Sequence, residues 1–225
     1  MAPRRPINYS ELPKVTVGSL LLTILVAFVI TAKQQWVQYF CVHRVYLFSL
    51  TGLFRSLLSV AYTGAFSVGF LMSTIFDAKC MWGLESNTFA RHEADFVWML
   101  LLGFVFTCAA CCVIPRYFFL GISLRYMVLY YWVRRNPFFK VSMYFIPLKA
   151  TLLPYALLII SFLTSGEIPW SGIVGLLAGH CYYFARDVVP LVYRHRRKPV
   201  PHYTQAPYWL RKVCGEVPSR HAHRD

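Results

Sequence analysis

Ser123 lies inside an apolar run, two residues after Gly121 and two before Arg125. Two alternatives are open for it: a buried nucleophile, or a packing residue on a helix that lines something wet. A serine nucleophile needs a general base within about 2.6–3.2 Å, and His180 is the only histidine inside an apolar stretch. At a rise of 1.5 Å per residue, Ser123 lies about 9 Å and His180 about 18 Å from the starts of their helices, which we place at the same membrane surface. This separation favours a serine that hydrogen-bonds within its own helix over a catalytic one.

Arg125 follows in the same run, where a charge at the centre of a spanning helix costs about 2.5–3.5 kcal/mol. No Asp or Glu lies inside any predicted span, so no acidic partner for Arg125 is expected. Two interpretations stay open: its side chain reaches back toward the interface at the start of its helix, or it lines a water-filled groove. Ser67 and Ser123 would add hydroxyl groups to such a groove. For the polar residues of the second span, Ser67 among them, interhelical hydrogen bonding with small-residue packing is the alternative.

The composition places these residues in a bilayer. Hydrophobic residues make up 57% of the 225 residues and charged residues 14%, against roughly 25% charged residues in a soluble domain. A spanning helix needs about 17–25 apolar residues. Six stretches approach this length: 15–32, 57–76, 96–114, 117–133, 150–165 and 168–185. We predict an all-α membrane protein with six spanning helices, and the short stretches predict local thinning of the bilayer.

Positive charges predict the orientation. With a cytosolic amino terminus, 17 Lys and Arg residues lie in cytosolic segments and four on the opposite side, so the positive-inside rule places both termini in the cytosol. A cleaved secretory signal is the alternative for the first stretch, although the stretch is longer than a usual signal. We divide the chain into a cytosolic segment (1–14), a membrane domain (15–193) and a basic, largely disordered cytosolic tail (194–225), in which 206–213 is a candidate surface helix.

Other features limit the function classes. The net charge of +14 indicates attraction to anionic lipid, and no nucleic acid is expected as a partner. Two aromatic, apolar connections, 34–57 and 137–147, are expected to lie in the membrane interface. Four of the seven cysteines lie inside spans and Cys41 alone faces the non-cytosolic side, so we predict no disulfide. No metal and no cofactor are expected.

Five segments carry a resemblance to one family, the derlins. They are, in chain order, ELPKVT (11–16), QYFCVHRVYLF (38–48), ESNTFARHEADFVWMLLLGF (85–104), YYWVRRNPFF (130–139) and GLLAGHCYYFARDVVP (175–190). The resemblance implies a six-span, rhomboid-like pseudoprotease of the endoplasmic reticulum membrane with both termini in the cytosol. It also implies a role in the retrotranslocation of misfolded proteins, alongside an HRD-type membrane ubiquitin ligase complex and a cytosolic AAA ATPase.

The resemblance bears on the candidate site residues as well. In active rhomboids the catalytic histidine comes three residues before the first glycine of a GxxxG motif, and Gly172 stands at that position before Gly175 and Gly179. Ser123 would therefore lack its base, and no enzymatic activity is expected. Gly121, Gly175 and Gly179 are expected to let helices pack closely.

Two departures from the derlin pattern affect the expected partners. Derlins carry a Trp-Arg pair in the first loop, where this chain has Phe54-Arg55, so the aromatic-plus-arginine chemistry is retained without an indole N–H. The tail lacks the Phe/Gly/Gln-rich motif through which some derlins bind the AAA ATPase. We therefore expect that ATPase to be recruited indirectly, through a partner in the complex.

The leading hypothesis is a non-enzymatic protein that eases the passage of misfolded chains across the endoplasmic reticulum membrane. A thinned bilayer beside a hydrophilic groove, lined by Ser67, Ser123 and Arg125, would lower the cost of moving polar groups through hydrocarbon. The first loop, with Phe54 and Arg55, would contact clients or partners on the lumenal side. Two alternatives stay open: an active rhomboid-type intramembrane serine protease, and a receptor that tethers clients to a ligase without a groove.

Overall fold

The computed structural model describes residues 13–42, 49–90, 92–114, 119–143, 146–196 and 204–216. This part of the chain is mostly helical. Its longer helices are α1 (Lys14–Ala32), α5 (Val68–Gly83), α6 (Glu93–Val113), α7 (Leu120–Arg135), α8 (Leu153–Ser165) and α9 (Trp170–Tyr183). Two of them, α1 and α6, are both long and apolar enough to cross a membrane. The helical character of the prediction is confirmed, whereas the number of six spans remains a prediction.

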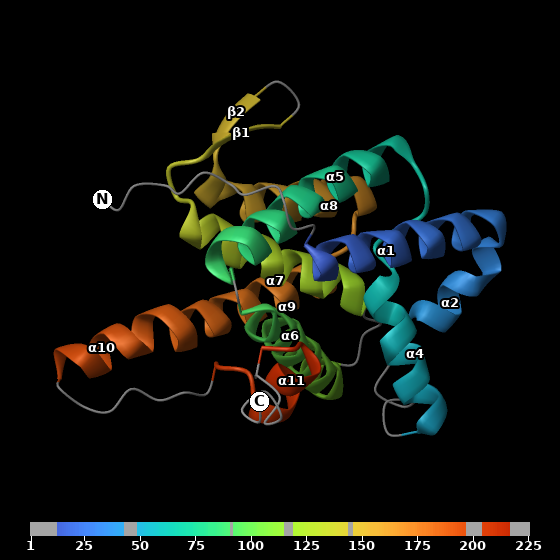
Figure 1. Ribbon diagram of the computed structural model, residues 1–225. Coiled ribbons are helices and arrows are strands. Elements are labelled where there is room, and N and C mark those ends of the chain that lie inside the picture. The colour runs from blue at the N-terminus through green and yellow to red at the C-terminus, as the bar shows by residue number, and fades with distance from the viewer. Residues whose placement is uncertain are drawn as a thin grey trace.

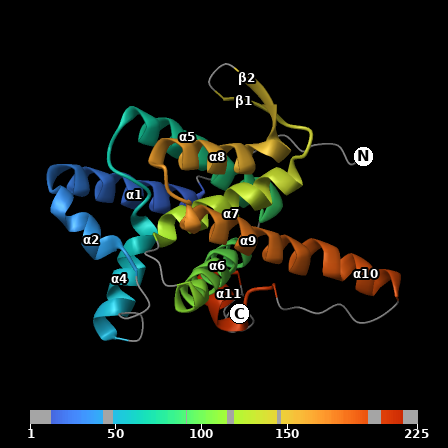
Figure 2. The same cartoon turned by 180° about the vertical axis from the view of Figure 1, so that it is seen from behind.

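Helix α7 is the centre of the bundle. Eleven of its 16 residues are buried, whereas α1 buries four of 19. Figures 1 and 2 show α7 between α5 and α8 on one side and α9 and α6 on the other, and α9 packs along α7. The main core gathers around the second half of α7, where Tyr131, Met127 and Val133 contact Phe89, Phe96 and Met99.

The second predicted span was misplaced. The apolar stretch 57–76 is divided in the structure between α4 (Leu50–Ala61) and α5, with a non-helical link at 62–67. Gly64 adopts a φ of 145° in this link, a conformation that glycine tolerates best. Ser67 then caps α5, because its hydroxyl accepts a hydrogen bond from the backbone N–H of Phe70 at 3.1 Å. Helix α5 therefore begins 11 residues later than the predicted span. It ends at Gly83 and is followed by a wider π-helical turn, η2 (Leu84–Thr88).

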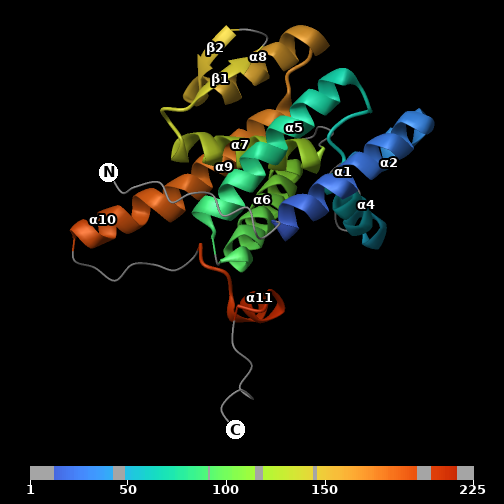
Figure 3. The ribbon, with the colours of Figure 1, turned by 45° about the horizontal axis from the view of Figure 1, so that its top comes forward.

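The two aromatic connections contain regular structure. The first holds η1 (Gln34–Trp36), α2 (Val37–Phe40) and α4. In the second, Pro137 follows the end of α7, where its ring cannot continue a helix. A β-hairpin then forms, with β1 (Lys140–Met143) antiparallel to β2 (Ile146–Lys149), and Figure 3 shows it beside α8. This hairpin, followed by the short turn η3 (Ala150–Leu152) before α8, departs from the predicted all-α architecture.

The carboxyl-terminal helix is longer than the predicted stretch 168–185. Helix α9 continues through a π-helical turn, η4 (Phe184–Val188), into α10 (Val189–His195), which projects from the bundle in Figure 2. The predicted short helix of the tail is present as α11 (Tyr208–Val213), below the start of α6 in Figure 1. Leu210 and Ala206 are buried against Ala94. Residues 204–216 are therefore attached to the bundle, within a segment that we expected to be largely disordered.

A buried carboxylate in η2 joins this turn to the start of α1. Glu85 is 5% exposed, and its two oxygens accept hydrogen bonds from the backbone N–H groups of Val15 and Thr16, at 3.1 and 2.9 Å. The hydroxyl of Thr16 donates a third bond at 2.6 Å. A carboxylate is favourable there, because the first N–H groups of a helix lack partners within the helix and carry its positive dipole end.

Candidate functional site

Ser123 ties two helices together. Its hydroxyl donates a hydrogen bond to the carbonyl oxygen of Ser171 on α9 at 2.7 Å, and it lies 3.5 Å from the carbonyl oxygen of Phe119 one turn back on α7. Ser123 is 1% exposed. Both of these partners are backbone acceptors, so no general base is bonded to this hydroxyl among the described residues.

His180 has a different partner. Its Nδ1 shares a hydrogen bond of 2.7 Å with the hydroxyl of Tyr130, and Tyr130 lies about two turns beyond Ser123 on α7. Helix depth predicts that Ser123 and His180 are apart, and in the structure each of them is bonded to a different partner. At the position of the rhomboid histidine, a side chain on Gly172 would stand 2.6 Å from Leu158 and 3.0 Å from the ring of Tyr126. A histidine in place of Gly172 would therefore collide with Leu158 and Tyr126.

Three glycines bring backbones into contact around α7. A β-carbon on Gly175 would collide with the carbonyl oxygen of Ser123, and one on Gly179 would lie 3.0 Å from the carbonyl oxygen of Met127. On the opposite face, a β-carbon on Gly121 would stand 2.6 Å from the carbonyl oxygen of Val60. All three therefore lie at helix contacts: Gly175 and Gly179 between α9 and α7, and Gly121 between α7 and α4.

Arg125 has an acidic partner, which corrects the prediction from the sequence. Its guanidinium forms an ion pair with Asp77 of α5, and the two side chains are 19% and 17% exposed. A longer contact of 3.5 Å reaches the carbonyl oxygen of Thr63. The prediction failed because it ended the second span at residue 76, so that Asp77 fell just outside it. An acidic residue within the apolar segment STIFDAKC, 73–80, was the available signal.

The three predicted groove residues do not meet on one surface. Ser123 contacts α9 and Arg125 contacts α5, because residues two apart on a helix point in different directions. Ser67 is exposed at the first turn of α5, and at 1.5 Å per residue it lies about 15 Å along the helix from Asp77.

The first-loop residues Phe54 and Arg55 lie on α4. Phe54 is 64% exposed. The guanidinium of Arg55 lies over the ring of Tyr39 from the preceding segment, 5.4 Å from its centroid, a geometry for a cation–π interaction. The aromatic partner of Arg55 in this contact is therefore Tyr39, a residue that sequence reasoning did not single out.

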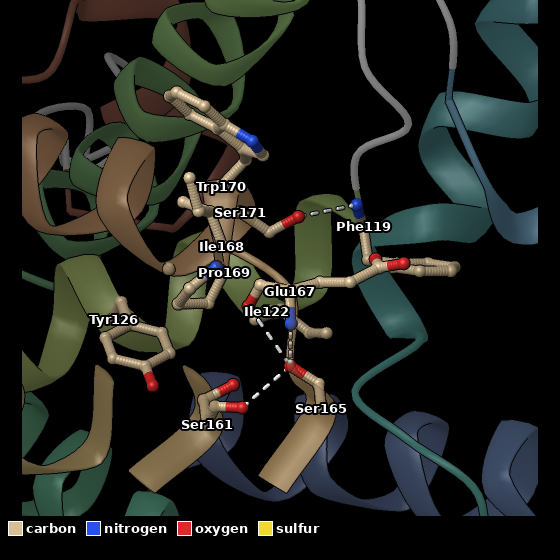
Figure 4. A pocket seen from close by; sticks show the side chains of 11 residues that line it. Phe119, Ile122, Tyr126, Ser161, Ser165, Glu167, Ile168, Pro169, Trp170 and Ser171 are labelled. Carbon is tan, nitrogen blue, oxygen red and sulfur yellow. Dashed lines mark hydrogen bonds between the residues drawn. The ribbon is translucent and has the colours of Figure 1, made fainter. Parts of the chain in front are cut away.

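A cavity opens beside Ser123, between α7, α8 and the start of α9 (Figure 4). Its volume is about 480 Å³, and its lining residues are Phe119, Ile122, Tyr126, Ser161, Ser165, Glu167, Ile168, Pro169, Trp170, Ser171 and Gly172. Ile122 and Tyr126 come from α7, on either side of Ser123 and Arg125. The cavity combines aromatic and apolar walls with three serines and one carboxylate, and mostly apolar walls with a few polar groups are the usual composition of a ligand pocket.

The polar rim of this cavity is ordered by local hydrogen bonds. The hydroxyl of Ser165 donates to the carbonyl oxygen of Ser161 at 2.8 Å and accepts from the backbone N–H of Glu167 at 3.2 Å. The hydroxyl of Ser171 accepts from the backbone N–H of Phe119 at 3.1 Å, and Figure 4 shows these bonds around the opening. Sequence reasoning missed Ser161 and Ser165, because serines near a helix end usually bond to the backbone of their own helix. It missed Glu167, because this residue lies in the short connection between the predicted spans 150–165 and 168–185.

Known proteins match most of the chain. The sequence profile of the Der1-like family matches residues 12–198. The chain is 34% identical over 164 residues to Derlin-1 of Arabidopsis thaliana, which covers 72% of this chain and 59% of that protein. It is 31% identical over 171 residues to Derlin-1 of Oryza sativa subsp. japonica, and 32% identical over 165 residues to Derlin-2.1 of Zea mays. The chain therefore spans 59%, 67% and 66% of the lengths of these three relatives.

Proposed function

The chain belongs to the Der1-like family, and from this premise we propose that it assists the retrotranslocation of misfolded proteins across the endoplasmic reticulum membrane, without enzymatic activity. Its apolar helices and its family indicate a membrane protein. We further propose six spans with both termini in the cytosol. The partners in this proposal are misfolded clients and an HRD-type ubiquitin ligase complex, which would supply the AAA ATPase indirectly.

The observation that carries the proposal is the cavity between α7, α8 and α9. Helix α8 has 13 residues and α7 has 16, so at 1.5 Å per residue they measure about 20 and 24 Å. The hydrocarbon core of a bilayer is about 30 Å thick. A bilayer beside short helices thins to match them, and here a cavity with polar groups lies at the same place. A polypeptide crossing there would leave fewer polar groups unpaired in hydrocarbon.

The hydrogen bonding of Ser123 supports the absence of proteolysis in this proposal. Its hydroxyl donates to Ser171, and His180 is engaged with Tyr130. A serine protease would need a base in place of Ser171. Labelling of Ser123 by a fluorophosphonate probe would contradict this part of the proposal.

The test uses cells that lack their own derlins and follows the half-life of a misfolded lumenal glycoprotein. The wild type and Ser123→Ala are expected to shorten the half-life equally. Ser161→Leu, which replaces a hydroxyl of the cavity wall with a larger apolar side chain, is expected to lose most of this rescue. Thr164→Leu is the matched control on α8, because Thr164 is exposed and does not line the cavity.

Equal rescue by Ser161→Leu and Thr164→Leu would remove the cavity from the mechanism and leave a tethering role. Access of water distinguishes the two roles directly. If the cavity is part of the path, a Ser161→Cys variant reacts with a membrane-impermeant thiol reagent in intact membranes. An Ile159→Cys variant, at an exposed apolar position of α8 outside the cavity, reacts much more slowly.

A further inference from the structure

A second cavity lies at the opposite ends of α7 and α9, and no step of the proposed function uses it. It has a volume of about 640 Å³ and is formed by the end of α7, the turn before the hairpin, and the η4–α10 segment. Its lining residues are Arg134, Arg135, Pro137, Phe138, Tyr183, Arg186, Asp187, Pro190, Leu191 and Arg194. Four arginines and one carboxylate give this cavity a positive charge.

Two of the arginines are already paired. Arg135 forms an ion pair of 2.9 Å with Asp187 and donates to the hydroxyl of Tyr131 at 3.2 Å. Arg186 contacts Asp95 at 3.3 Å and donates to the hydroxyl of Tyr182 at 3.0 Å. These contacts fix the wall of the cavity, and the two carboxylates offset the two charges.

The other two arginines supply the excess charge. Within the described ranges, no carboxylate forms an ion pair with Arg134 or Arg194, and both residues are exposed. The guanidinium of Arg134 lies 5.0 Å from the ring centroid of Tyr183 and 5.5 Å from that of Tyr130. Stacking on aromatic rings leaves the N–H groups of a guanidinium directed outward in its plane, where they can bind two oxygens of one anion.

The rim of the cavity is apolar. Phe138 is 89% exposed and Leu191 is 65% exposed. Large apolar side chains beside arginines, at the end of spanning helices, are typical of the level where lipid headgroups meet acyl chains. An occupant that is anionic at one end and apolar at the other matches both parts of this surface, whereas an acidic peptide would leave the apolar rim unused.

We propose that this cavity binds the phosphorylated headgroup of an anionic membrane lipid of the phosphoinositide class, with the phosphate on Arg134 and Arg194 and the acyl chains against Phe138 and Leu191. In the orientation proposed above, this cavity lies on the cytosolic side of the membrane. Basic pockets between helices on that side bind such headgroups. The volume lies within the range of about 300–1,000 Å³ that is usual for small-molecule sites. A phosphomonoester is favoured over a singly charged headgroup, because two uncompensated guanidinium groups face the cavity.

The proposal is tested by native mass spectrometry on the full-length protein in detergent micelles. Phosphatidylinositol 4-phosphate, phosphatidylinositol and phosphatidylserine are added separately. We expect the first lipid to bind at least tenfold more tightly than the other two. A soluble inositol bisphosphate is expected to bind at least tenfold more weakly than the lipid, because it lacks the acyl chains. Equal binding of the three lipids, or a soluble headgroup that binds as tightly as the lipid, overturns the proposal.

Variants assign the site. Arg134→Gln/Arg194→Gln is expected to weaken binding of phosphatidylinositol 4-phosphate at least tenfold, and Arg194→Gln alone, at an exposed helix end, at least threefold. Lys140→Gln/Lys149→Gln removes the same charge from the neighbouring hairpin, outside the cavity, and is expected to leave binding unchanged. An equal loss in both double variants would mean that general surface charge, and not this cavity, attracts the lipid. Polyglutamate serves as a competitor that imitates an acidic protein partner. If it displaces the lipid equally from the wild type, from Lys140→Gln/Lys149→Gln and from Arg194→Gln, an acidic protein partner is indicated instead of the lipid.

Discussion

The hydroxyl of Ser123 on α7 donates a hydrogen bond to the carbonyl oxygen of Ser171 on α9, 2.7 Å away. One turn further along α9, Gly175 lies directly against the backbone of Ser123. The serine and the glycine together set how closely the two helices approach. In this contact Ser123 acts as a packing residue, because its only proton is already donated to the neighbouring helix.

Gly175→Ala is expected to destabilise the protein by about 1–3 kcal/mol, because the added methyl group forces α9 away from α7. The unfolding temperature in detergent measures this effect. Gly18→Ala is the matched control: Gly18 lies on α1 and has no atom within 4 Å of an added β-carbon. That variant should be neutral or stabilised by about 0.5–1 kcal/mol, from the better helix propensity of alanine. Equal melting of the two variants would disprove the close contact.

Removing either partner of the Asp77–Arg125 pair is expected to cost about 3–5 kcal/mol, because a charge stays behind without compensation. Asp77→Asn and Arg125→Gln should each lower the unfolding temperature strongly. The double variant Asp77→Asn/Arg125→Gln should recover much of the loss, since two neutral amides can pair. Lys79→Gln, two residues along α5, serves as the control for changing an exposed charge. Additive losses in the double variant would argue against a direct pair.

Glu85→Gln is expected to destabilise the docking of α1 by about 1–3 kcal/mol. The amide keeps one acceptor oxygen but turns an NH₂ group toward backbone N–H groups, which leaves a buried donor unsatisfied. Hydrogen exchange of the amides of Val15 and Thr16 should become faster. Glu93→Gln should change little, because the contact of Glu93 with Lys14 is long, 3.9 Å, and exposed. Unchanged protection in Glu85→Gln would contradict this role.

Asp95→Ala is expected to release α11 from the bundle. The carboxylate of Asp95 accepts a hydrogen bond from the backbone N–H of Ala206 at 2.8 Å and pairs with Arg186 at 3.3 Å. Without it, amide exchange in 206–214 should rise at least tenfold, while exchange in α7 stays unchanged. Glu93→Ala, two residues before Asp95 on α6, controls for loss of a carboxylate at the same helix end. Protection of 206–214 that persists in Asp95→Ala would assign the attachment to the remaining contacts, which are the burial of Ala206 and Leu210 and the hydrogen bond from the N–H of Ala94 to Glu216.

Cys41 is expected to react slowly with thiol reagents at neutral pH. Burial raises the pKa of the Cys41 thiol to about 11, and only the thiolate is nucleophilic. Labelling by a maleimide, followed by peptide mass spectrometry, should therefore accelerate about tenfold per pH unit from pH 8 to pH 10. Glutathione in the same tube, with its ordinary thiol, provides the reference rate. Cys41 labelling as fast as glutathione at pH 7.5 would show an exposed thiol.

Much of this molecule follows from local properties of the sequence. Apolar stretches locate helices at α1, α6, α7, α8 and α9 within a few residues, because burying apolar side chains in lipid depends on composition more than on detail. The motif segments identify the family, and Gly175 and Gly179 mark a close helix contact. The second span was placed wrongly, because Gly64 and Ser67 interrupt a continuous apolar run with a link and a cap that hydropathy does not register.

The partners of the polar residues were decided by the tertiary structure. Ser123 and Ser171 are 48 residues apart in the chain, and Ser123 and Arg125 turn to different neighbours although only two residues separate them. Which polar group meets which depends on the rotation and height of each helix, and those are set by the packing of the whole bundle. The sequence alone therefore determines that polar groups lie inside an apolar protein, and only the folded bundle decides whether they form a bond, an ion pair or the wall of a cavity.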